Sequence, residues 1–132
     1  VGRTQSIVPH KRRVSSMTPT ILFQGDKPCL VLGAPGGSNI PMAIAQVILN
    51  VVDFGMPVVE AVAAPRISAT SDVIDVSARI PAYTCEALGK LGYKTARSTQ
   101  SFTVARVHAI QVQGDRLSGA ADPAGGGMAL EV

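Results

Sequence analysis

The sequence predicts an α+β fold, a layered α/β arrangement in which an antiparallel sheet packs on helices. Two hairpin patterns near the ends of the chain, with helical patterns between them, support this prediction. Hydrophobic residues make up 46% of the 132 residues and charged residues 16%, which is enough apolar material for one core. We therefore expect a single domain over residues 1–132.

The first hairpin is expected from Thr20 to Gly33. The runs 20–24 and 29–33 are rich in β-forming residues, and the four residues from Gly25 to Pro28 have the composition of a turn. Residues 1–14 are polar and basic without a period, which predicts an extended segment leading into this hairpin.

Three helices are expected in the middle of the chain. The longest, over residues 40–54, has Ser38 or Asn39 as a cap and Pro41 in its first turn. Its apolar residues leave little polar face, so we expect burial on most sides. Shorter helices are expected over 57–64 and 81–92, the latter with an apolar face, and short strands over 66–68, 73–76 and 93–95.

The second hairpin is expected from Val104 to Ala121. Residues 104–113 alternate in polarity, and Gly114-Asp115 separates them from the run 116–121. The glycine-rich tail after this hairpin predicts a loop.

Charge and composition argue against several kinds of partner. The net charge is +3, and its densest run, Lys11-Arg12-Arg13, is short and lacks interleaved aromatic residues, so a solvated basic loop is favoured over a nucleic-acid site. The longest apolar stretch, 40–52, contains Pro41, Gln46 and Asn50, so no membrane span is expected.

The sequence contains few residues that could bind a metal ion or form a disulfide. His10 and His108 are the only histidines, so neither a metal nor another cofactor is expected. Cys29 and Cys85 could form one disulfide, but two small buried hydrophobic side chains are the favoured interpretation.

Two segments are the candidates for chemistry. Ser15-Ser16 offers adjacent hydroxyls that can donate to a carboxylate, although a local serine turn is the simpler interpretation of such a pair. Gly36-Gly37 precedes the long helix, where backbone N–H groups can approach a developing oxyanion, although a plain tight turn is the alternative. A phosphate loop is disfavoured because no Lys-Ser/Thr follows the glycines.

The residues around these segments resemble the C-terminal part of the small subunit of the γ-glutamyltranspeptidases. The similarity follows the family's order through 11–21, 31–38, Ala64-Pro65-Arg66 and 119–123, and covers roughly residues 9–127. The resemblance implies the N-terminal nucleophile hydrolase fold, a four-layer αββα sandwich of which this chain would be a part.

The resemblance also implies roles for individual residues. Ser15 and Ser16 would bind the α-carboxylate of a γ-glutamyl group, Met17 would shape the pocket, and Gly36 and Gly37 would form the oxyanion hole. By contrast, we place Arg66 and Asp122 outside the site as structural residues, and we expect His108 to be packed rather than catalytic.

The activity implied by the resemblance needs more than these residues. In the family, a precursor cleaves itself, and the new N-terminal Thr attacks γ-glutamyl amides such as glutathione with its own amino group as base. No segment here matches that nucleophile, and Val1 cannot replace it. We therefore expect a piece of a longer protein that needs a large subunit and an upstream small-subunit segment, and that is inactive alone.

Substrate and role stay open at this point. Thr18 stands where many relatives have Ser, and residues 68–75 lack the histidine-rich run of many transpeptidases. A related acylase or amidohydrolase with another amide substrate, or a non-catalytic interaction domain, are the alternatives. A periplasmic or extracellular location would follow from the resemblance alone.

Overall fold

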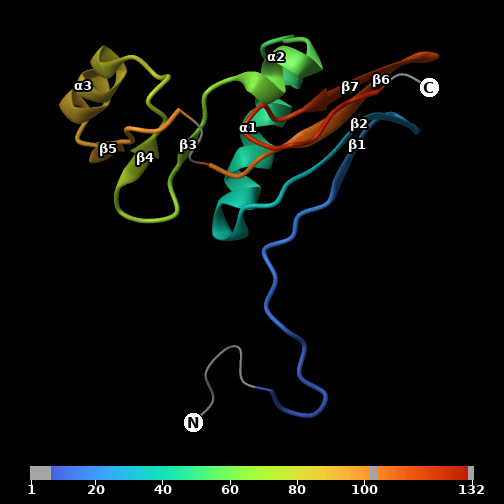
Figure 1. Cartoon of the computed structure of the whole chain (residues 1–132), viewed down its shortest axis with the longest axis horizontal. Coiled ribbons are helices and arrows are strands. Elements are labelled where there is room, and N and C mark those ends of the chain that lie inside the picture. Colours follow the sequence, from blue (N-terminus) through green and yellow to red (C-terminus); the bar gives the residue numbers. More distant parts are fainter. Residues whose placement is uncertain (1–6, 102–103, 131–132) are drawn as a thin grey trace.

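A computed structural model describes residues 7–101 and 104–130 of the chain (Figure 1). The first half contains β1 (Thr20–Gln24), β2 (Lys27–Gly33), the short 3-10 turn η1 (Gly37–Asn39), α1 (Ile40–Val52) and α2 (Val58–Ala63). The second half contains β3 (Ile67–Ser68), β4 (Ile74–Val76), α3 (Ala82–Lys90), β5 (Thr95–Arg97), β6 (His108–Gln113) and β7 (Arg116–Ala121).

The main sheet has the strand order β1-β2-β6-β7, and every neighbouring pair in it is antiparallel. The helices α1 and α2 lie against this sheet, which confirms the expected α+β architecture (Figure 1). A smaller sheet, β3-β4-β5, forms a separate lobe with α3. Its β4–β5 pair is parallel, unlike the pairs of the main sheet, which are antiparallel as expected.

The core lies between the main sheet and the two helices. Side chains from every other position of β2 and β6 meet the apolar stripe of α1 and α2, as alternation along a strand requires. The buried members are Leu30, Leu32, Ile40, Ala43, Ile44, Val47, Val58, Ala61, Val62, Ala105, Val107, Ala109 and Ala120. Burial of α1 on most sides is not observed, because Leu49 and Val52 are 47% and 57% exposed.

In each hairpin, one strand begins at a different residue from the one predicted. The first turn is only Gly25-Asp26, since β2 begins at Lys27 and Gln24 pairs with that residue. Pro28 is tolerated in the strand because the register shifts beside it, where its missing N–H is not needed. In the second hairpin, β6 begins at His108 rather than Val104, because the preceding residues bond to loops instead of to a strand.

Three local predictions also need correction. Asn39 is the N-cap residue of α1, one of the two expected positions, but its side chain accepts from the Ser68 hydroxyl instead of making a capping hydrogen bond. The helix α3 has no buried residue, and Tyr83 and Leu91 of its expected apolar face are 70% and 74% exposed. The third short strand begins at Thr95 rather than Tyr93, because Thr95 is the residue that pairs with Ile74 of β4.

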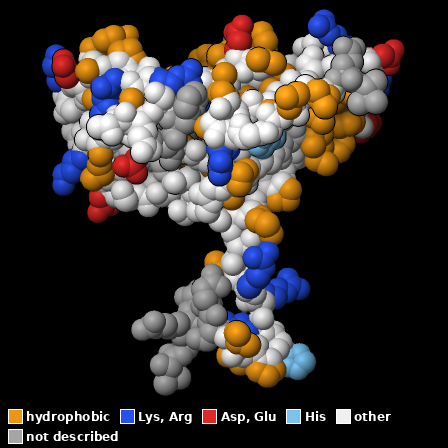
Figure 2. Space-filling view, viewed as in Figure 1, with side chains coloured by type: hydrophobic (Ala, Val, Ile, Leu, Met, Phe, Trp, Pro, Cys, Tyr) orange, Lys and Arg blue, Asp and Glu red, His pale blue; other side chains and the backbone are white. Residues whose placement is uncertain are grey.

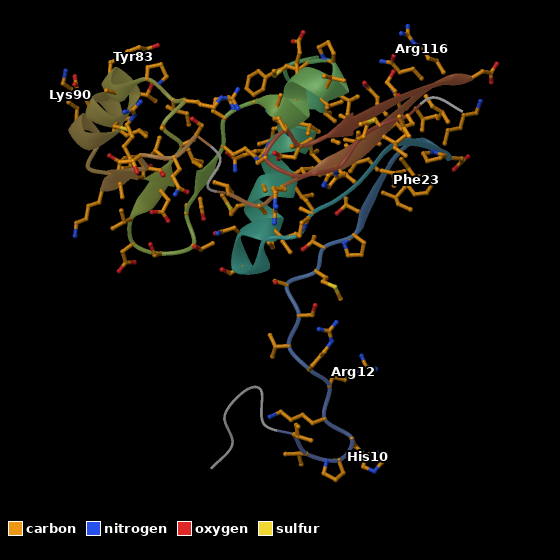
Figure 3. The ribbon with its side chains drawn as sticks, in the orientation of Figure 1. His10, Arg12, Phe23, Tyr83, Lys90 and Arg116 are labelled. Atoms are coloured by element: carbon orange, nitrogen blue, oxygen red, sulfur yellow. The ribbon has the colours of Figure 1, made fainter. Side chains whose placement is uncertain are left out.

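The face of the main sheet opposite the helices is apolar and open to solvent. Ile21, Val31 and Ile110 are cross-strand neighbours on this face, and Phe23 and Leu117 add to it. Hydrophobic side chains gather over the β1–β2 hairpin in Figure 2. Figure 3 labels Phe23 in the same region. We call these five residues the outer face. The segment 128–130 lies beside part of it.

Within the described ranges, none of the helices has the length and hydropathy needed to cross a bilayer. Cys29 and Cys85 are free thiols, but both are half-buried rather than buried as predicted.

Candidate functional site

The glycine turn connects the end of β2 to the start of α1. Gly36 has φ 148° and Gly37 has φ 61°, backbone conformations that L side chains rarely adopt. The Gly36 carbonyl accepts from the Asn39 N–H at 3.3 Å, and the Gly37 carbonyl accepts from the Ile40 N–H. These two bonds fix the turn directly on the N-terminus of α1, the positive end of the helix dipole.

Both glycine N–H groups are available to a ligand. Gly36 and Gly37 are exposed, and no carbonyl in residues 7–101 or 104–130 accepts from their N–H groups. A Cβ added at Gly37 would meet nothing within 4 Å, whereas one at Gly36 would lie 2.3 Å from the Cβ of Ala105. The turn therefore leaves two backbone N–H groups without an acceptor among the described residues, and it packs tightly on Ala105 at Gly36.

The serine pair lies in the extended segment before β1. The Ser15 Oγ accepts from the Met17 N–H at 3.2 Å, which is the local serine turn that such a pair favours. That bond uses Ser15 as an acceptor and leaves its O–H proton for a further partner. The Ser16 hydroxyl has no partner among the described residues, although its carbonyl accepts from the Thr18 hydroxyl at 2.9 Å.

The sheet register brings the serine segment and the glycine turn to the same end of the β1–β2 hairpin. Thr20, the first residue of β1, pairs with Leu32 near the end of β2. The chain therefore enters this end from Ser15-Ser16 and leaves it toward Gly36-Gly37. No described hydrogen bond joins the two segments. In Figure 3 the residues further upstream, at His10 and Arg12, extend away from the two sheets.

The remaining predicted positions contribute less to the site. Met17 is 63% exposed, so it has not closed a pocket around the serine pair. His108 is half-buried at the start of β6, where its ring approaches Gly127, which fits a packed histidine. No cluster of metal-binding side chains occurs in the part of the chain that the structure describes.

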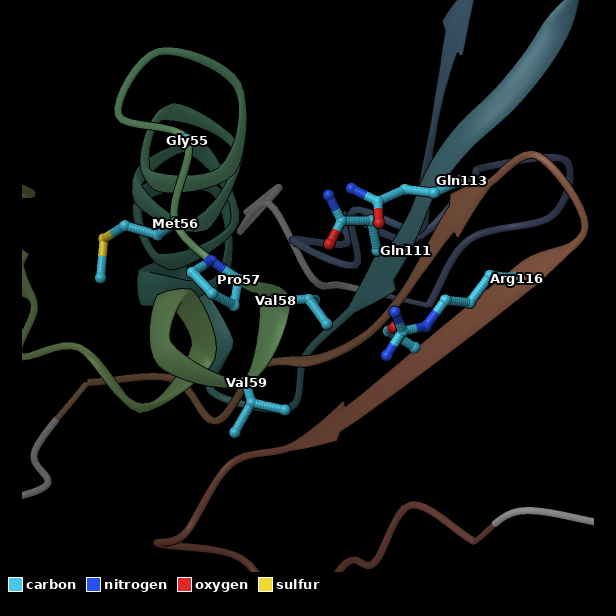
Figure 4. Close-up of a pocket in the computed structure, with 9 residues that line it drawn as sticks. Gly55, Met56, Pro57, Val58, Val59, Gln111, Gln113 and Arg116 are labelled. Carbon is cyan, nitrogen blue, oxygen red and sulfur yellow. The ribbon is translucent and has the colours of Figure 1, made fainter.

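A cleft of about 440 Å³ lies at the opposite end of the main sheet (Figure 4). Residues 55–59 form one wall, and Gln111, Gln113, Arg116 and Ser118 form the other. The β6–β7 pairing of Gln113 with Arg116 lies at the hairpin tip, whereas Gly33 pairs with His108 at the other end of β6. This cleft contains none of the residues predicted to bind substrate.

A buried ion pair joins Arg66 to Asp122. The guanidinium also donates to the carbonyls of Val62 at 2.6 Å and Ala105 at 3.2 Å, while Asp122 accepts from the Val107 N–H at 3.1 Å. The structural ion pair predicted for Arg66 is confirmed. Sequence reasoning missed Ala105, which contacts both the ion pair and Gly36, because a lone alanine carries no pattern that marks such a position.

Comparisons with known proteins show which family this chain resembles in sequence. A family model described as Gamma-glutamyltranspeptidase matches residues 2–132. A glutathione hydrolase proenzyme of Pseudomonas aeruginosa is 39% identical over 132 residues, covering 96% of this chain and 23% of the proenzyme. An acylase ACY 1 proenzyme of Pseudomonas sp. (strain SE83) is 36% identical over 97 residues, covering 74% of this chain and 17% of that protein.

A solved structure supports the same assignment. The γ-glutamyltranspeptidase from Pseudomonas nitroreducens complexed with L-DON matches with a TM-score of 0.83 and 37% identity, over 96% of this chain and 67% of that chain. The chain thus spans less than a quarter of the proenzyme of Pseudomonas aeruginosa. Since the family model matches residues 2–132 and the fold is that of a solved member, the chain belongs to the γ-glutamyltranspeptidase family.

Proposed function

We propose that this chain supplies the oxyanion hole and the donor-carboxylate site of an enzyme that cleaves γ-glutamyl amides such as glutathione. The observation that carries the proposal is the pair of exposed N–H groups at Gly36 and Gly37, which have no acceptor among the described residues. Donors that are already in place stabilise a developing oxyanion without reorganisation during the reaction. The start of α1 adds its dipole in the same direction.

The serine pair would bind the α-carboxylate end of the γ-glutamyl substrate. Ser15 and Ser16 each retain a hydroxyl proton, and a carboxylate accepts several hydrogen bonds. Their position at the same end of the hairpin as the glycines suits a γ-glutamyl group, whose α-carboxylate and γ-carbonyl are separated by a short carbon chain. The flexible thioether of Met17 would then pack on that chain.

In the proposed reaction, a Thr hydroxyl from an upstream segment attacks the γ-carbonyl carbon, and its proton passes to the Thr amino group. The carbonyl oxygen becomes an anion that accepts from Gly36 and Gly37. Collapse of this intermediate breaks the amide bond, and the proton moves to the leaving amine. Water or an acceptor amino acid or peptide then attacks the resulting ester and restores the Thr hydroxyl.

The partners in this proposal are a large subunit and the upstream segment that carries the nucleophile. The outer face supports a protein partner, because a row of exposed Ile21, Val31 and Ile110 on a regular sheet is suited to pack on a second sheet. The proposed upstream strands would cover this face and complete the αββα sandwich.

Residues 1–132 produced alone are expected to release no p-nitroaniline from γ-glutamyl-p-nitroanilide above the blank, because no residue among them matches the family's nucleophile. The measurement is absorbance against protein concentration, with the complete protein as the positive control. Release that rises in proportion to the concentration of the 132-residue chain would contradict the proposed need for an upstream Thr.

Replacing Ser15 and Ser16 together with Ala in the complete protein is expected to raise KM for the donor by about ten- to a hundred-fold. Each hydrogen bond to a charged group contributes about 1.5–3 kcal/mol, and partial replacement by water reduces the loss. Steady-state kinetics with γ-glutamyl-p-nitroanilide provide the measurement.

The matched control for this experiment is Ser71→Ala. Ser71 Oγ accepts from the N–H two residues later, at Val73, in the same local turn that Ser15 makes with Met17. It lies in the loop between β3 and β4, so its removal should leave KM unchanged. Equal effects of the two changes would show that the serine pair acts only through its local turn.

A related acylase is the second candidate function, favoured by the 36% identity to the ACY 1 proenzyme. Three p-nitroanilides separate the candidates: γ-glutamyl carries the α-carboxylate and α-amino groups, glutaryl keeps only the carboxylate, and butyryl has neither. The proposed function predicts that kcat/KM falls in that order. An acylase that ignores the carboxylate would hydrolyse the butyryl compound as well as the others.

A further inference from the structure

We infer that Arg66 is a positioning residue for the glycine turn, acting through Ala105; this inference rests on the proposed function of that turn. The starting observation is the close approach of Gly36 to Ala105. A Cβ at Gly36 would lie 2.3 Å from the Ala105 Cβ and 2.6 Å from its Cα. The glycine turn therefore packs directly against the backbone of Ala105.

Ala105 and the two residues after it are bonded to the turn and to the ion pair. The Arg106 N–H donates to the Pro35 carbonyl at 3.1 Å, directly before the glycines. The Arg66 guanidinium donates to the Ala105 carbonyl at 3.2 Å, and the Val107 N–H donates to Asp122 at 3.1 Å. The segment 105–107 is thus held by the ion pair on one side and contacts residues 35–36 on the other.

Burial makes this arrangement rigid. The side chain of Arg66 is 6% exposed and that of Asp122 is fully buried, so water does not compete for their bonds. Arg66 also bonds to the Val62 carbonyl at 2.6 Å, which ties the pair to the end of α2. A planar guanidinium can serve these three acceptors together, whereas a lysine ammonium cannot match the same fork geometry.

The strand that follows Arg66 holds the other end of the turn. The Ser68 hydroxyl donates to the Asn39 Oδ1 at 2.7 Å, and Asn39 is the last residue of η1. Ile67, which lies between Arg66 and Ser68 in the chain, exchanges two hydrogen bonds of 2.9 Å with the Gln46 side chain of α1. Residues 66–68 therefore fix both ends of the turn, one through Ala105 and the other through Asn39.

Arg66→Lys in the complete protein is the test of this role. Since the turn supplies donors to the transition state, we expect kcat to fall by about ten-fold or more, while the serine pair keeps KM within about three-fold. The matched control is Arg97→Lys on β5, where the guanidinium also donates to backbone carbonyls but only to Ala78 and Ile80 of the smaller lobe. The control should change neither constant by more than about two-fold.

Hydrogen exchange gives a readout that does not depend on activity. In Arg66→Lys, amides of residues 34–39 are expected to exchange faster, while those of α3 stay unchanged. Ala105→Gly, which leaves the ion pair intact, should show the same faster exchange and a smaller loss of kcat. Unchanged exchange at 34–39 in both variants, or a kcat that falls only with the folded fraction, would overturn the inference. A wild-type protein without γ-glutamyl turnover would refute the proposed function instead, and the exchange comparison would still test the positioning role.

Discussion

Replacing Gly36 with Ala in the complete protein is expected to lower kcat/KM by about a hundred-fold or more, the loss typical of a missing oxyanion donor. The new Cβ would lie 2.3 Å from the Ala105 Cβ and 2.6 Å from its Cα, closer than real Cβ contacts. Because the Cα belongs to the backbone of a segment bonded to Pro35 and Arg66, neither side can shift without displacing the turn. The measurement is steady-state turnover of γ-glutamyl-p-nitroanilide.

The matched variant is Gly37→Ala, at the next residue. Its Cβ would meet nothing within 4 Å, and only the φ of 61° would be strained. That strain costs about 1–2 kcal/mol, so the expected loss in kcat/KM is about ten-fold, with the N–H donor retained. Gly37→Pro removes the donor and cannot adopt the φ of 61°, so it is expected to lose about a hundred-fold or more through both effects. Equal losses in Gly36→Ala and Gly37→Ala would show that contact with Ala105 does not decide the geometry of the turn.

Replacing Asp122 with Ala is expected to cost about 3–5 kcal/mol of unfolding free energy, because it leaves the buried Arg66 guanidinium without its counter-charge. The Val107 and Ala124 N–H groups would also lose their acceptors. Thermal melting of the complete protein, followed by a dye or by circular dichroism, gives the measurement. We expect a clearly lower Tm together with less folded protein after expression.

Asp72→Ala is the control for this change, since Asp72 is an exposed carboxylate in the loop before β4. Its removal is expected to change stability by no more than about 0.5 kcal/mol. A double variant, Arg66→Met with Asp122→Leu, should melt above Asp122→Ala, because no charge then stays buried and unpaired. A double variant whose loss of stability equals the sum of the losses in Arg66→Met alone and Asp122→Leu alone would argue that the two charges do not interact.

Much of the fold and of the candidate site could be predicted from local pattern. The Gly25-Asp26 and Gly114-Asp115 turns, the periodic helix beginning at Ile40 and the prolines at both sides of α2 each act within a few residues, so they are readable without a structure. Gly36-Gly37 before a helix predicted a turn from local pattern, whereas its role as a donor site came from the resemblance and stays a prediction. The start of β6 was misplaced because residues 104–107 alternate like a strand but bond to Pro35 and Asp122.

The residue types at the site, the helix that follows the glycines and the resemblance confirmed by the family match could all be read without a structure. This is because turn preferences, periodicity and motif order are properties of neighbouring residues. The meeting of Arg66, Ala105 and Asp122 beside Gly36 became visible only in the folded chain, as did the exposure of the outer face. Those features depend on contacts between residues far apart in the chain, which hydrogen bonding and burial select only once the core has formed.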